Sequence, residues 1–256
     1  MSTGKLAALG KLVSPAYAEV PEAVRAKLLS VAVPTLSAEL FKKGFHTRFF
    51  SGLKPLNPKA AKFCGAAWTV RAMPIREDLR AAIAKGDIPS RNRLALDAAP
   101  RGSVLVCGSG GTPNNALMGD IMVTSLMTKG VAAIVLDTGV SDANLISSMP
   151  VPVIAFGSAP VSSFAVIMVI DHDTPIGVQG VAVFPGDVIV GDENGAVCIP
   201  RHLADEIADA AIEEERLEAF LLERIKAGAP IDGTYPPSAR ILDEYRAWAA
   251  GGKGPK

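Results

Sequence analysis

Residues 104–142 read VLVCGSGGTPNNALMGDIMVTSLMTKGVAAIVLDTGVSD, and this stretch decides the fold. An apolar run enters a glycine-rich segment, and a helix-like run from residue 121 ends at Gly130, the residue type that most often stops a helix. A second apolar run follows at residues 132–137. This order predicts a strand–loop–helix–strand unit with parallel strands. Open sheets of this kind place their ligand sites where such strands end.

Polar groups stand at two ends of this unit. Asp120 precedes the helical run, and Asp142 follows the second strand and a turn. Two carboxylates so placed can hold a hard divalent cation with several waters, as Mg²⁺ prefers. The amides of Ile121 and Met122, in the first helical turn, suit an anionic substrate group. From the residues alone a plainer interpretation also stands, in which Asp120 is a helix-start acid and Asp142 a turn acid.

The segment GSGG at residues 108–111 raises the question of a phosphate-binding loop. It lacks the Lys-Ser/Thr end of a Walker motif, and it does not fit GxGxxG with a helix starting at once. The pattern favours instead a loop whose backbone closely approaches a small ligand.

Two other groups of titratable residues are candidates. His172, between Asp171 and Asp173, is a possible proton carrier, although a lone loop histidine is more often simply solvated. The acidic run at residues 213–215 reads as a solvated helix face. In an oligomer, one of these acids could instead reach a neighbouring site.

Composition excludes several classes of protein. The chain has 256 residues, 49% of them hydrophobic and 20% charged, with a net charge of zero. These values indicate a globular protein without bulk attraction to nucleic acid or to an anionic membrane. No apolar run reaches about 18 residues, the length that spans a bilayer. The three cysteines stand singly and form no CxxC pair, which predicts reduced, buried thiols and a cytoplasmic location.

The order of elements predicts one main domain with extensions. Residues 1–20 read as an N-terminal arm, residues 21–228 as a single domain and residues 229–256 as a tail that contacts a neighbouring subunit. The expected helices span residues 23–30, 38–43, 75–85, 91–98, 203–227 and 239–249, and a meander of short strands is expected at 181–184, 187–190 and 196–199.

Three segments together resemble a known family. They are LDTGVSD at 136–142, PVIAFG at 152–157 and GVAVFPGDVIVGDENG at 180–195. The chain is similar, over roughly residues 20–230, to the regulator-of-ribonuclease-activity-A family, which includes class II 4-hydroxy-4-methyl-2-oxoglutarate and 4-carboxy-4-hydroxy-2-oxoadipate aldolases. The resemblance implies an α/β fold, a three-layer ββα sandwich like the phosphohistidine swivelling domain, with N-terminal helices and a C-terminal helical tail. It also implies a homotrimer or homohexamer with sites between subunits.

The aldolase branch carries an aspartate, twenty residues and then Arg-Asp. Here Asp120 is followed by twenty residues and then by Ser141-Asp142, so both acids are in register. The resemblance implies that Asp142 binds Mg²⁺ or Mn²⁺, and that Asp120 either helps to position metal-bound water or acts in proton transfer. It also implies a substrate-binding set of Gly119, Asp120, Ile121, Met122 and Ser141, in which the amides of Ile121 and Met122 hold the carboxylate of a 2-oxo acid. The implied reaction is retro-aldol cleavage, or decarboxylation of oxaloacetate, which gives pyruvate through an enolate.

Ser141 departs from the family pattern, which places there an arginine that clamps the pyruvoyl carboxylate. A charge-assisted hydrogen bond contributes about 1.5–3 kcal/mol, and serine is too short and uncharged to replace it. Another arginine, at position 71, 76, 91 or 93, is a possible substitute. Three hypotheses follow: a metal-dependent lyase acting at Asp120 and Ser141, a non-catalytic regulatory or binding trimer, and an enzyme with a changed substrate.

Overall fold

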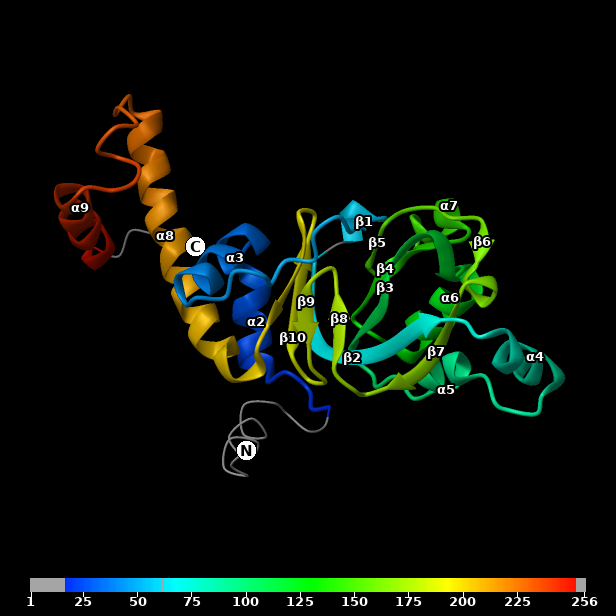
Figure 1. Cartoon of the computed structure of the whole chain (residues 1–256). Coiled ribbons are helices and arrows are strands. Elements are labelled where there is room, and N and C mark those ends of the chain that lie inside the picture. Colours follow the sequence, from blue (N-terminus) through cyan, green and yellow to red (C-terminus); the bar gives the residue numbers. More distant parts are fainter. Residues whose placement is uncertain (1–16, 61, 252–256) are drawn as a thin grey trace.

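The computed structural model describes residues 17–60 and 62–251. The two strands predicted on either side of the helix at residues 121–129 lie side by side at the centre of a mixed sheet (Figure 1). The strands are β1 (Lys54–Pro55), β2 (Phe63–Pro74), β3 (Val104–Met118), β4 (Ala133–Val140), β5 (Val153–Ala155), β6 (Val161–Ser162), β7 (Ile167–His172), β8 (Ile176–Val178), β9 (Val181–Val183), β10 (Val188–Asp192) and β11 (Gly195–Ile199).

The main sheet has the order β1-β5-β4-β3-β2-β10-β11. Within it, β2, β3, β4 and β5 are parallel neighbours, which confirms the predicted unit. β2 pairs with β10 along its first half and with β7 along its second half, and the ladder shifts register between Arg71 and Ala72. β6 pairs with β3, and β8 and β9 form a separate hairpin. β2 is therefore the strand that joins the two halves of the sheet.

Helices cover this sheet and extend beyond it. They are α2 (Glu22–Ser30), α3 (Val33–Lys42), α4 (Glu77–Lys85), α5 (Arg91–Asp97), α6 (Asp120–Lys129), α7 (Ala143–Ile146), α8 (Ala204–Lys226) and α9 (Ala239–Ala250), with short 3₁₀ turns η1 (Pro58–Ala60), η2 (Ser163–Ala165) and η3 (Arg201–Leu203). The α/β fold with N-terminal helices and a C-terminal helical tail is thus confirmed. The likeness to the phosphohistidine swivelling domain stays an expectation.

Strand β4 is buried on both faces, as parallel strands between two layers are. Ile134 and Leu136 belong to the core that α5, α6 and α7 cover. Ala133 and Val135 belong to a second core, which the β8–β9 hairpin covers. A third core lies between β10–β11 and the helices α2, α3 and α8. The packing of β3 and β4 between the first two cores fixes the positions of their carboxyl ends.

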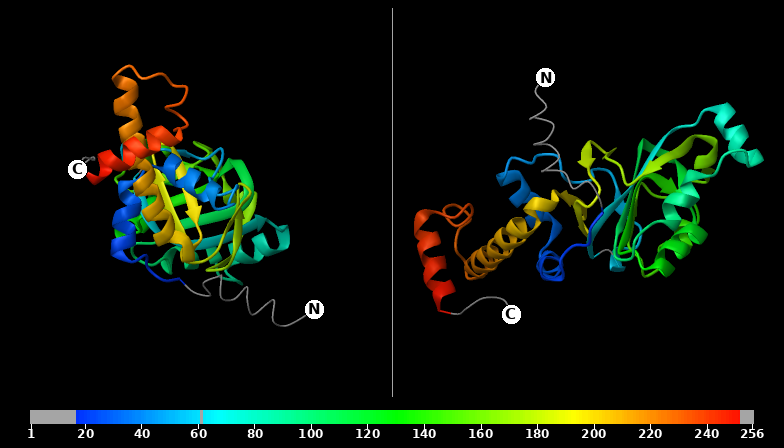
Figure 2. Two further views of the ribbon diagram at one scale, coloured as in Figure 1. Left: turned by 90° about the vertical axis from the view of Figure 1, so that its left-hand side faces the viewer. Right: turned by 90° about the horizontal axis from the view of Figure 1, so that it is seen from below.

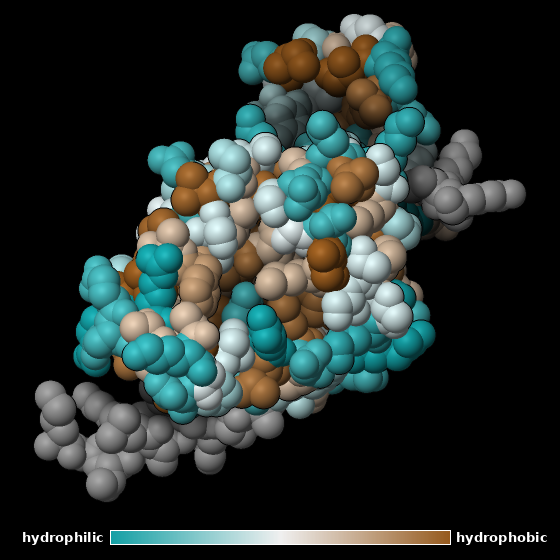
Figure 3. Space-filling view, turned by 90° about the vertical axis from the view of Figure 1, so that its right-hand side faces the viewer, coloured by the Kyte–Doolittle hydropathy of each residue, from teal (hydrophilic) through white to brown (hydrophobic). Residues whose placement is uncertain are grey.

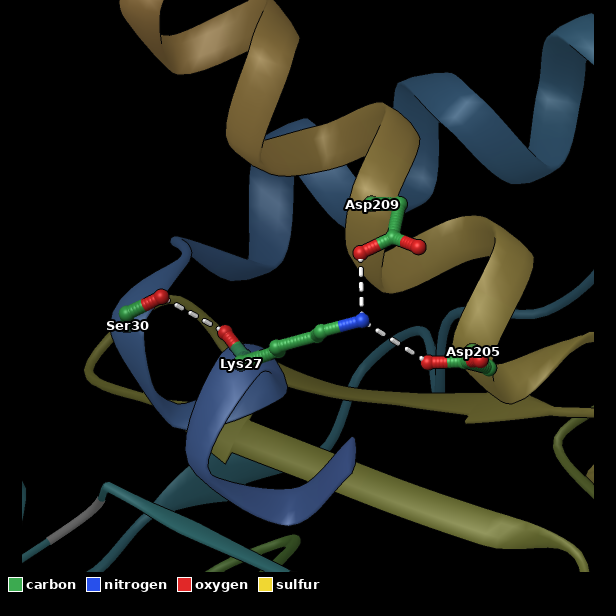
Figure 4. A network of polar contacts seen from close by, with 4 residues as sticks. All are labelled: Lys27, Ser30, Asp205 and Asp209. Atoms are coloured by element: carbon green, nitrogen blue, oxygen red, sulfur yellow. Dashed lines mark hydrogen bonds and ion pairs between the residues drawn. The ribbon is translucent and has the colours of Figure 1, made fainter. Parts of the chain in front are cut away.

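Helix α2 is fixed to α8 by Lys27 as well as by apolar contacts (Figure 4). The Lys27 ammonium lies 3.0 Å from Asp205 Oδ1 and 2.6 Å from Asp209 Oδ1. Hydrogen bonds with Asp209 and Asp205 raise the pKa of Lys27. Since exposed ion pairs contribute little, the buried side chains of Leu28 and Ile207 do most of the stabilising here.

Two predicted features differ from the structure. The helix expected at residues 38–43 begins at Val33, with Pro34 in its first turn, where a missing N–H costs nothing, so Ser37 is not its cap. The expected meander is two hairpins, because β9 pairs with β8 whereas β10 and β11 join the main sheet through β2. Between the hairpins, the carboxylate of Asp187 accepts a hydrogen bond from the Phe184 amide at 2.9 Å and so tightens the turn.

Helix α9 and the end of α8 project away from the sheet (Figures 1 and 2). Phe220 and Leu221 of α8 pack with Ile241 and Tyr245 of α9 in an apolar cluster separate from the three cores. The predicted tail thus packs on its own chain, and its contact with a neighbouring subunit stays a prediction. Of the predicted arm, residues 1–16 lie outside the described residues. None of the helices in the described part is long and apolar enough to cross a membrane.

Candidate active site

The site begins where two parallel strands end side by side. Met118, the last residue of β3, is the Cα partner of Val140, the last residue of β4. Each strand then turns, through Gly119 into α6 and through Ser141 into α7. The Ser141 amide donates a hydrogen bond to the Met118 carbonyl at 3.2 Å, which holds the two turns together.

Three of the predicted site residues, Gly119, Ser141 and Asp142, lie in contact with one another. A β carbon built on Gly119 would lie 2.5 Å from Ser141 Oγ and 2.6 Å from Asp142 Oδ2. Real side chains do not approach so closely, so the position accepts only glycine without rearrangement. The hydroxyl of Ser141 and the carboxylate of Asp142 therefore pack directly against the backbone that starts α6.

Asp142 is held by its backbone and leaves its carboxylate available. Its φ of 55° lies in the left-handed region, which Asp tolerates better than most residues. Its carbonyl accepts hydrogen bonds from the amides of Leu145 and Ile146 at 2.9 and 3.1 Å. The side chain makes no capping hydrogen bond to α7 and is exposed. None of the described residues pairs with this carboxylate, which lies against Gly119 at the start of α6.

Asp120 occupies the first position of α6 and closes part of the predicted anion site. Its Oδ1 accepts a hydrogen bond from the Ile121 amide at 2.8 Å. The N-cap residue of α6 is Gly119, which has no side chain with which to cap the helix. The amide of Ile121, expected to hold a substrate carboxylate, therefore already holds a carboxylate of the protein, and an entering anion must displace it. Met122 follows in the same turn.

The carboxylate oxygens of the site are ligands that suit a hard, strongly hydrated cation. Within residues 17–60 and 62–251, no three His, Cys, Asp or Glu side chains gather closely enough to hold a metal ion. Asp142 offers an exposed carboxylate as an oxygen ligand, and a cation held there would keep most of its waters. Mg²⁺ binds in this way, through one or two carboxylates plus water and substrate oxygens.

The glycine-rich segment binds an anion that belongs to the protein. The amides of Ser109 and Gly111 donate hydrogen bonds to the carboxylate of Asp137 at 2.7 and 2.9 Å. Asp137 is fully buried, which raises its pKa, while these hydrogen bonds act in the opposite direction. At Gly108 the close approach is also internal, because an added β carbon would lie 2.6 Å from the Gly177 carbonyl. Residues 108–111, expected as a ligand-binding loop, therefore lie within β3, where their amides bind the carboxylate of Asp137 on β4.

The acids of the family-like string GDVIVGDENG serve the fold. The carboxylate of Asp187 accepts from the Phe184 and Arg201 amides, and that of Asp192 accepts from the Val33 and Asn194 amides. Both acids are buried. They join the β10–β11 hairpin to its neighbours rather than to the site.

The acidic run at residues 213–215 is not a simple solvated face. Glu213 accepts a hydrogen bond from the Tyr245 hydroxyl at 2.6 Å, and Glu214 pairs with Lys42 at 2.8 Å. Glu215 accepts one from the Ala32 amide at 2.6 Å. The three acids thus connect α8 to α9 and to the N-terminal helices.

His172 packs against another side chain, and the three cysteines are buried in the protein. The His172 ring packs against Trp68, with 5.3 Å between ring centroids. Cys64, Cys107 and Cys198 are free and buried, as predicted. Burial raises the pKa of Cys64 to about 12.

The candidate substitute arginines lie in different places. Arg76 pairs with Asp78 at 2.7 Å, and Arg71 lines a small cleft beside Gly108. Arg93 lines a larger cleft of about 590 Å³, whose wall also contains Met122 of the predicted anion site. Asp120, Ser141 and Asp142 do not line this cleft. No sequence pattern indicated this cleft, because its walls come from chain segments far apart.

The chain is similar to several known proteins. The RraA-like family, described as Aldolase/RraA, matches residues 33–198. A putative 4-hydroxy-4-methyl-2-oxoglutarate aldolase of Halalkalibacterium halodurans is 27% identical over 169 residues, which cover 66% of this chain and 74% of that protein. Protein DlpA of Legionella pneumophila is 26% identical over 180 residues, 70% of this chain but only 28% of that protein's length.

A solved structure shares the fold. It is Streptomyces coelicolor RraAS2, described as an unusual member of the RNase ES inhibitor RraA protein family. Its TM-score is 0.70 at 30% identity, and the match covers 80% of this chain and 98% of that one. Because the family match spans the sheet, α6 and the turn at Asp142, the chain belongs to the RraA-like family, Aldolase/RraA.

Proposed function

We propose that this chain is a divalent-metal-dependent lyase that cleaves a 4-hydroxy-2-oxo acid, or decarboxylates oxaloacetate, and releases pyruvate. The observation that carries the proposal is the contact of the Ser141 and Asp142 side chains with Gly119, at the first turn of α6. A free carboxylate, a hydroxyl and helix amides meet there. Relatives named as 4-hydroxy-4-methyl-2-oxoglutarate aldolases support the reaction class.

Each residue of the site has a role under this proposal. Asp142 holds Mg²⁺ or Mn²⁺, partly through water, and the bound cation supplies a Lewis acid for the 2-oxo group. Once Asp120 turns away, the amides of Ile121 and Met122 bind the substrate carboxylate, and the Ser141 hydroxyl donates a further hydrogen bond to it. Asp120 accepts the proton of the C4 hydroxyl as the bond between C3 and C4 breaks, which leaves a carbonyl at C4 and the enolate of pyruvate. The proton then passes from Asp120 to C3 and gives pyruvate.

The test couples pyruvate release to lactate dehydrogenase. The substrates are 4-hydroxy-4-methyl-2-oxoglutarate and oxaloacetate, each with Mg²⁺, with Mn²⁺ and with EDTA. We expect metal-dependent pyruvate from the natural chain and its loss, by at least 100-fold, in Asp142→Ala, because the one free carboxylate at the turn is removed. Asp142→Asn, which keeps the left-handed turn, should lose activity equally. The exposed acid Asp97 supplies the control, since Asp97→Ala should keep full activity. Full activity in Asp142→Asn would contradict the metal role.

The second candidate is a binding or regulatory protein, and Ser141 is the observation that favours it. RraAS2 is described as belonging to a family of RNase ES inhibitors. If Ser141 only weakens a lyase, Ser141→Arg should raise pyruvate formation about tenfold or more, because a charge-assisted bond to the carboxylate is restored. No gain in a folded variant would favour a changed substrate or a protein partner, and Ser141→Lys would separate the effect of charge from that of the guanidinium fork.

The assembly is proposed to be a homotrimer or homohexamer in which a neighbouring subunit covers the site. Two apolar side chains beside the site support this, Ile121 at 81% exposure on α6 and Leu145 at 58% on α7. Exposed apolar groups that lie together mark interaction surfaces. Residues 21–228 are proposed as the domain that repeats in the assembly and 229–256 as a further contact. A monomeric mass by light scattering would contradict the assembly.

A further inference from the structure

The cleft that Arg93 lines has walls from four parts of the chain. The end of α4 and the start of α5 form one side, and η2 with β7 forms the other. Leu117 and Met122 form the part nearest α6. The guanidinium of Arg80 lies 5.8 Å from the centre of the Phe164 ring and so connects α4 to η2 across the rim. The molecule seen from the α4 end has hollows with apolar side chains in them (Figure 3).

The charge of the cleft has one sign. Its two charged lining residues are Lys85 and Arg93, and none of its lining residues is acidic. Neither cation forms an ion pair or a side-chain hydrogen bond with another residue in the described part of the chain, whereas Arg76, before α4, is paired with Asp78. Two unpaired cations in a cleft whose other lining residues are apolar or uncharged favour an anionic ligand.

The cleft also contains a buried polar atom without a partner. The Oδ1 atom of Asn92 is buried and accepts no hydrogen bond from any described residue. Such an acceptor is costly unless a ligand or water supplies a donor. The other walls are mostly apolar, with Leu117, Met122 and Ile167 among them. A volume of about 590 Å³ is within the range of small-molecule sites and exceeds what a five- or six-carbon acid fills.

We infer that this cleft is a specificity subsite for a carboxylate with a bulky apolar body, with Arg93 as the residue that receives the carboxylate. This inference rests on the proposed function, because Met122 of the first turn of α6 lines the cleft, which would therefore take the part of the substrate distal to the 2-oxo group. Asn92 Oδ1 accepts a hydrogen bond from a hydroxyl group on that part. The chain is thereby selective for 2-oxo acids with a larger substituent at C4 than methyl.

The test measures equilibrium binding by titration calorimetry, without metal and without turnover. The probe is 4-phenylbutanoate, compared with its neutral amide and with acetate. We expect saturable binding of 4-phenylbutanoate by the natural chain, about tenfold weaker binding by Arg93→Ala, and partial recovery in Arg93→Lys. The neutral amide should bind the natural chain about as weakly as 4-phenylbutanoate binds Arg93→Ala. Acetate should bind the natural chain more weakly than the amide does.

Two further variants separate the outcomes. Arg76→Ala removes an arginine that is already paired and does not line the cleft, so it should bind 4-phenylbutanoate like the natural chain. Asp142→Ala should also bind it normally, even if all lyase activity is lost, so failure of the lyase proposal does not remove the subsite. Absence of saturable binding, or equal binding by Arg93→Ala, would overturn the inference.

Discussion

Replacing Gly119 by alanine is expected to abolish metal-dependent pyruvate formation, with a loss of at least 100-fold. The added methyl group would stand 2.5 Å from Ser141 Oγ and 2.6 Å from Asp142 Oδ2, so either both side chains move or the start of α6 moves. A displacement of about 1 Å in a positioned catalytic group can cost 100-fold in rate. The measurement is the coupled pyruvate assay with Mg²⁺, together with circular dichroism to verify folding.

Gly177 supplies the matched control. A β carbon there would meet no atom within 4 Å, and its φ is not in the left-handed region, so Gly177→Ala should keep both fold and activity. Wild-type activity in Gly119→Ala would show that Ser141 and Asp142 need not keep their present positions for the reaction.

Replacing Asp137 by alanine is expected to lower the free energy of unfolding by about 3 kcal/mol. The change leaves the buried amide of Ser109 and the partly buried amide of Gly111 without their acceptor, and an unsatisfied buried group costs about 1–3 kcal/mol. In urea denaturation, the variant should unfold at a lower midpoint concentration, with an unchanged slope of the free energy of unfolding against urea concentration. Asp137→Asn should lose less, because it keeps the size of the side chain and one acceptor oxygen.

The exposed acid at position 97 gives the comparison for stability. It lies on α5 and pairs with Lys129 at 3.8 Å, so Asp97→Ala should change the free energy of unfolding by less than about 0.5 kcal/mol. If Asp137→Ala were equally mild, the amides of residues 109–111 would have found other acceptors, and the segment would not depend on this carboxylate.

The predicted site residues could be grouped from the sequence because parallel strands end at a common edge. That rule placed Asp120 and Asp142 at the ends of the unit, whereas Gly119 and Ser141 entered as site residues through the family resemblance. The structure puts the side chains of Ser141 and Asp142 against Gly119. It could not show that Asp120 binds the amide of Ile121, since this depends on a side-chain rotamer. The roles of these residues in binding and catalysis stay predictions.

Other features depend on contacts between distant parts of the chain. The glycine-rich segment looked available to a ligand because its acceptor, Asp137, comes 28 residues after Ser109. The Arg93 cleft exists because β7 returns to pair with β2 after an excursion through the whole α6 unit. Periodicity and turn residues describe local structure, and they carry no information on such pairings.

Helix α8 takes part in two apolar clusters that share no other element. Its first half packs through Ile207 with the helices and strands of the body, and its second half packs through Phe220 with α9. Opening of the α9 cluster therefore need not disturb the sheet, and the two regions can unfold as separate cooperative units. The two tryptophans report them individually, since Trp68 lies in the core beside α5 and Trp248 lies against the cluster on α9. The fluorescence of single-tryptophan variants would then yield two melting transitions from one polypeptide.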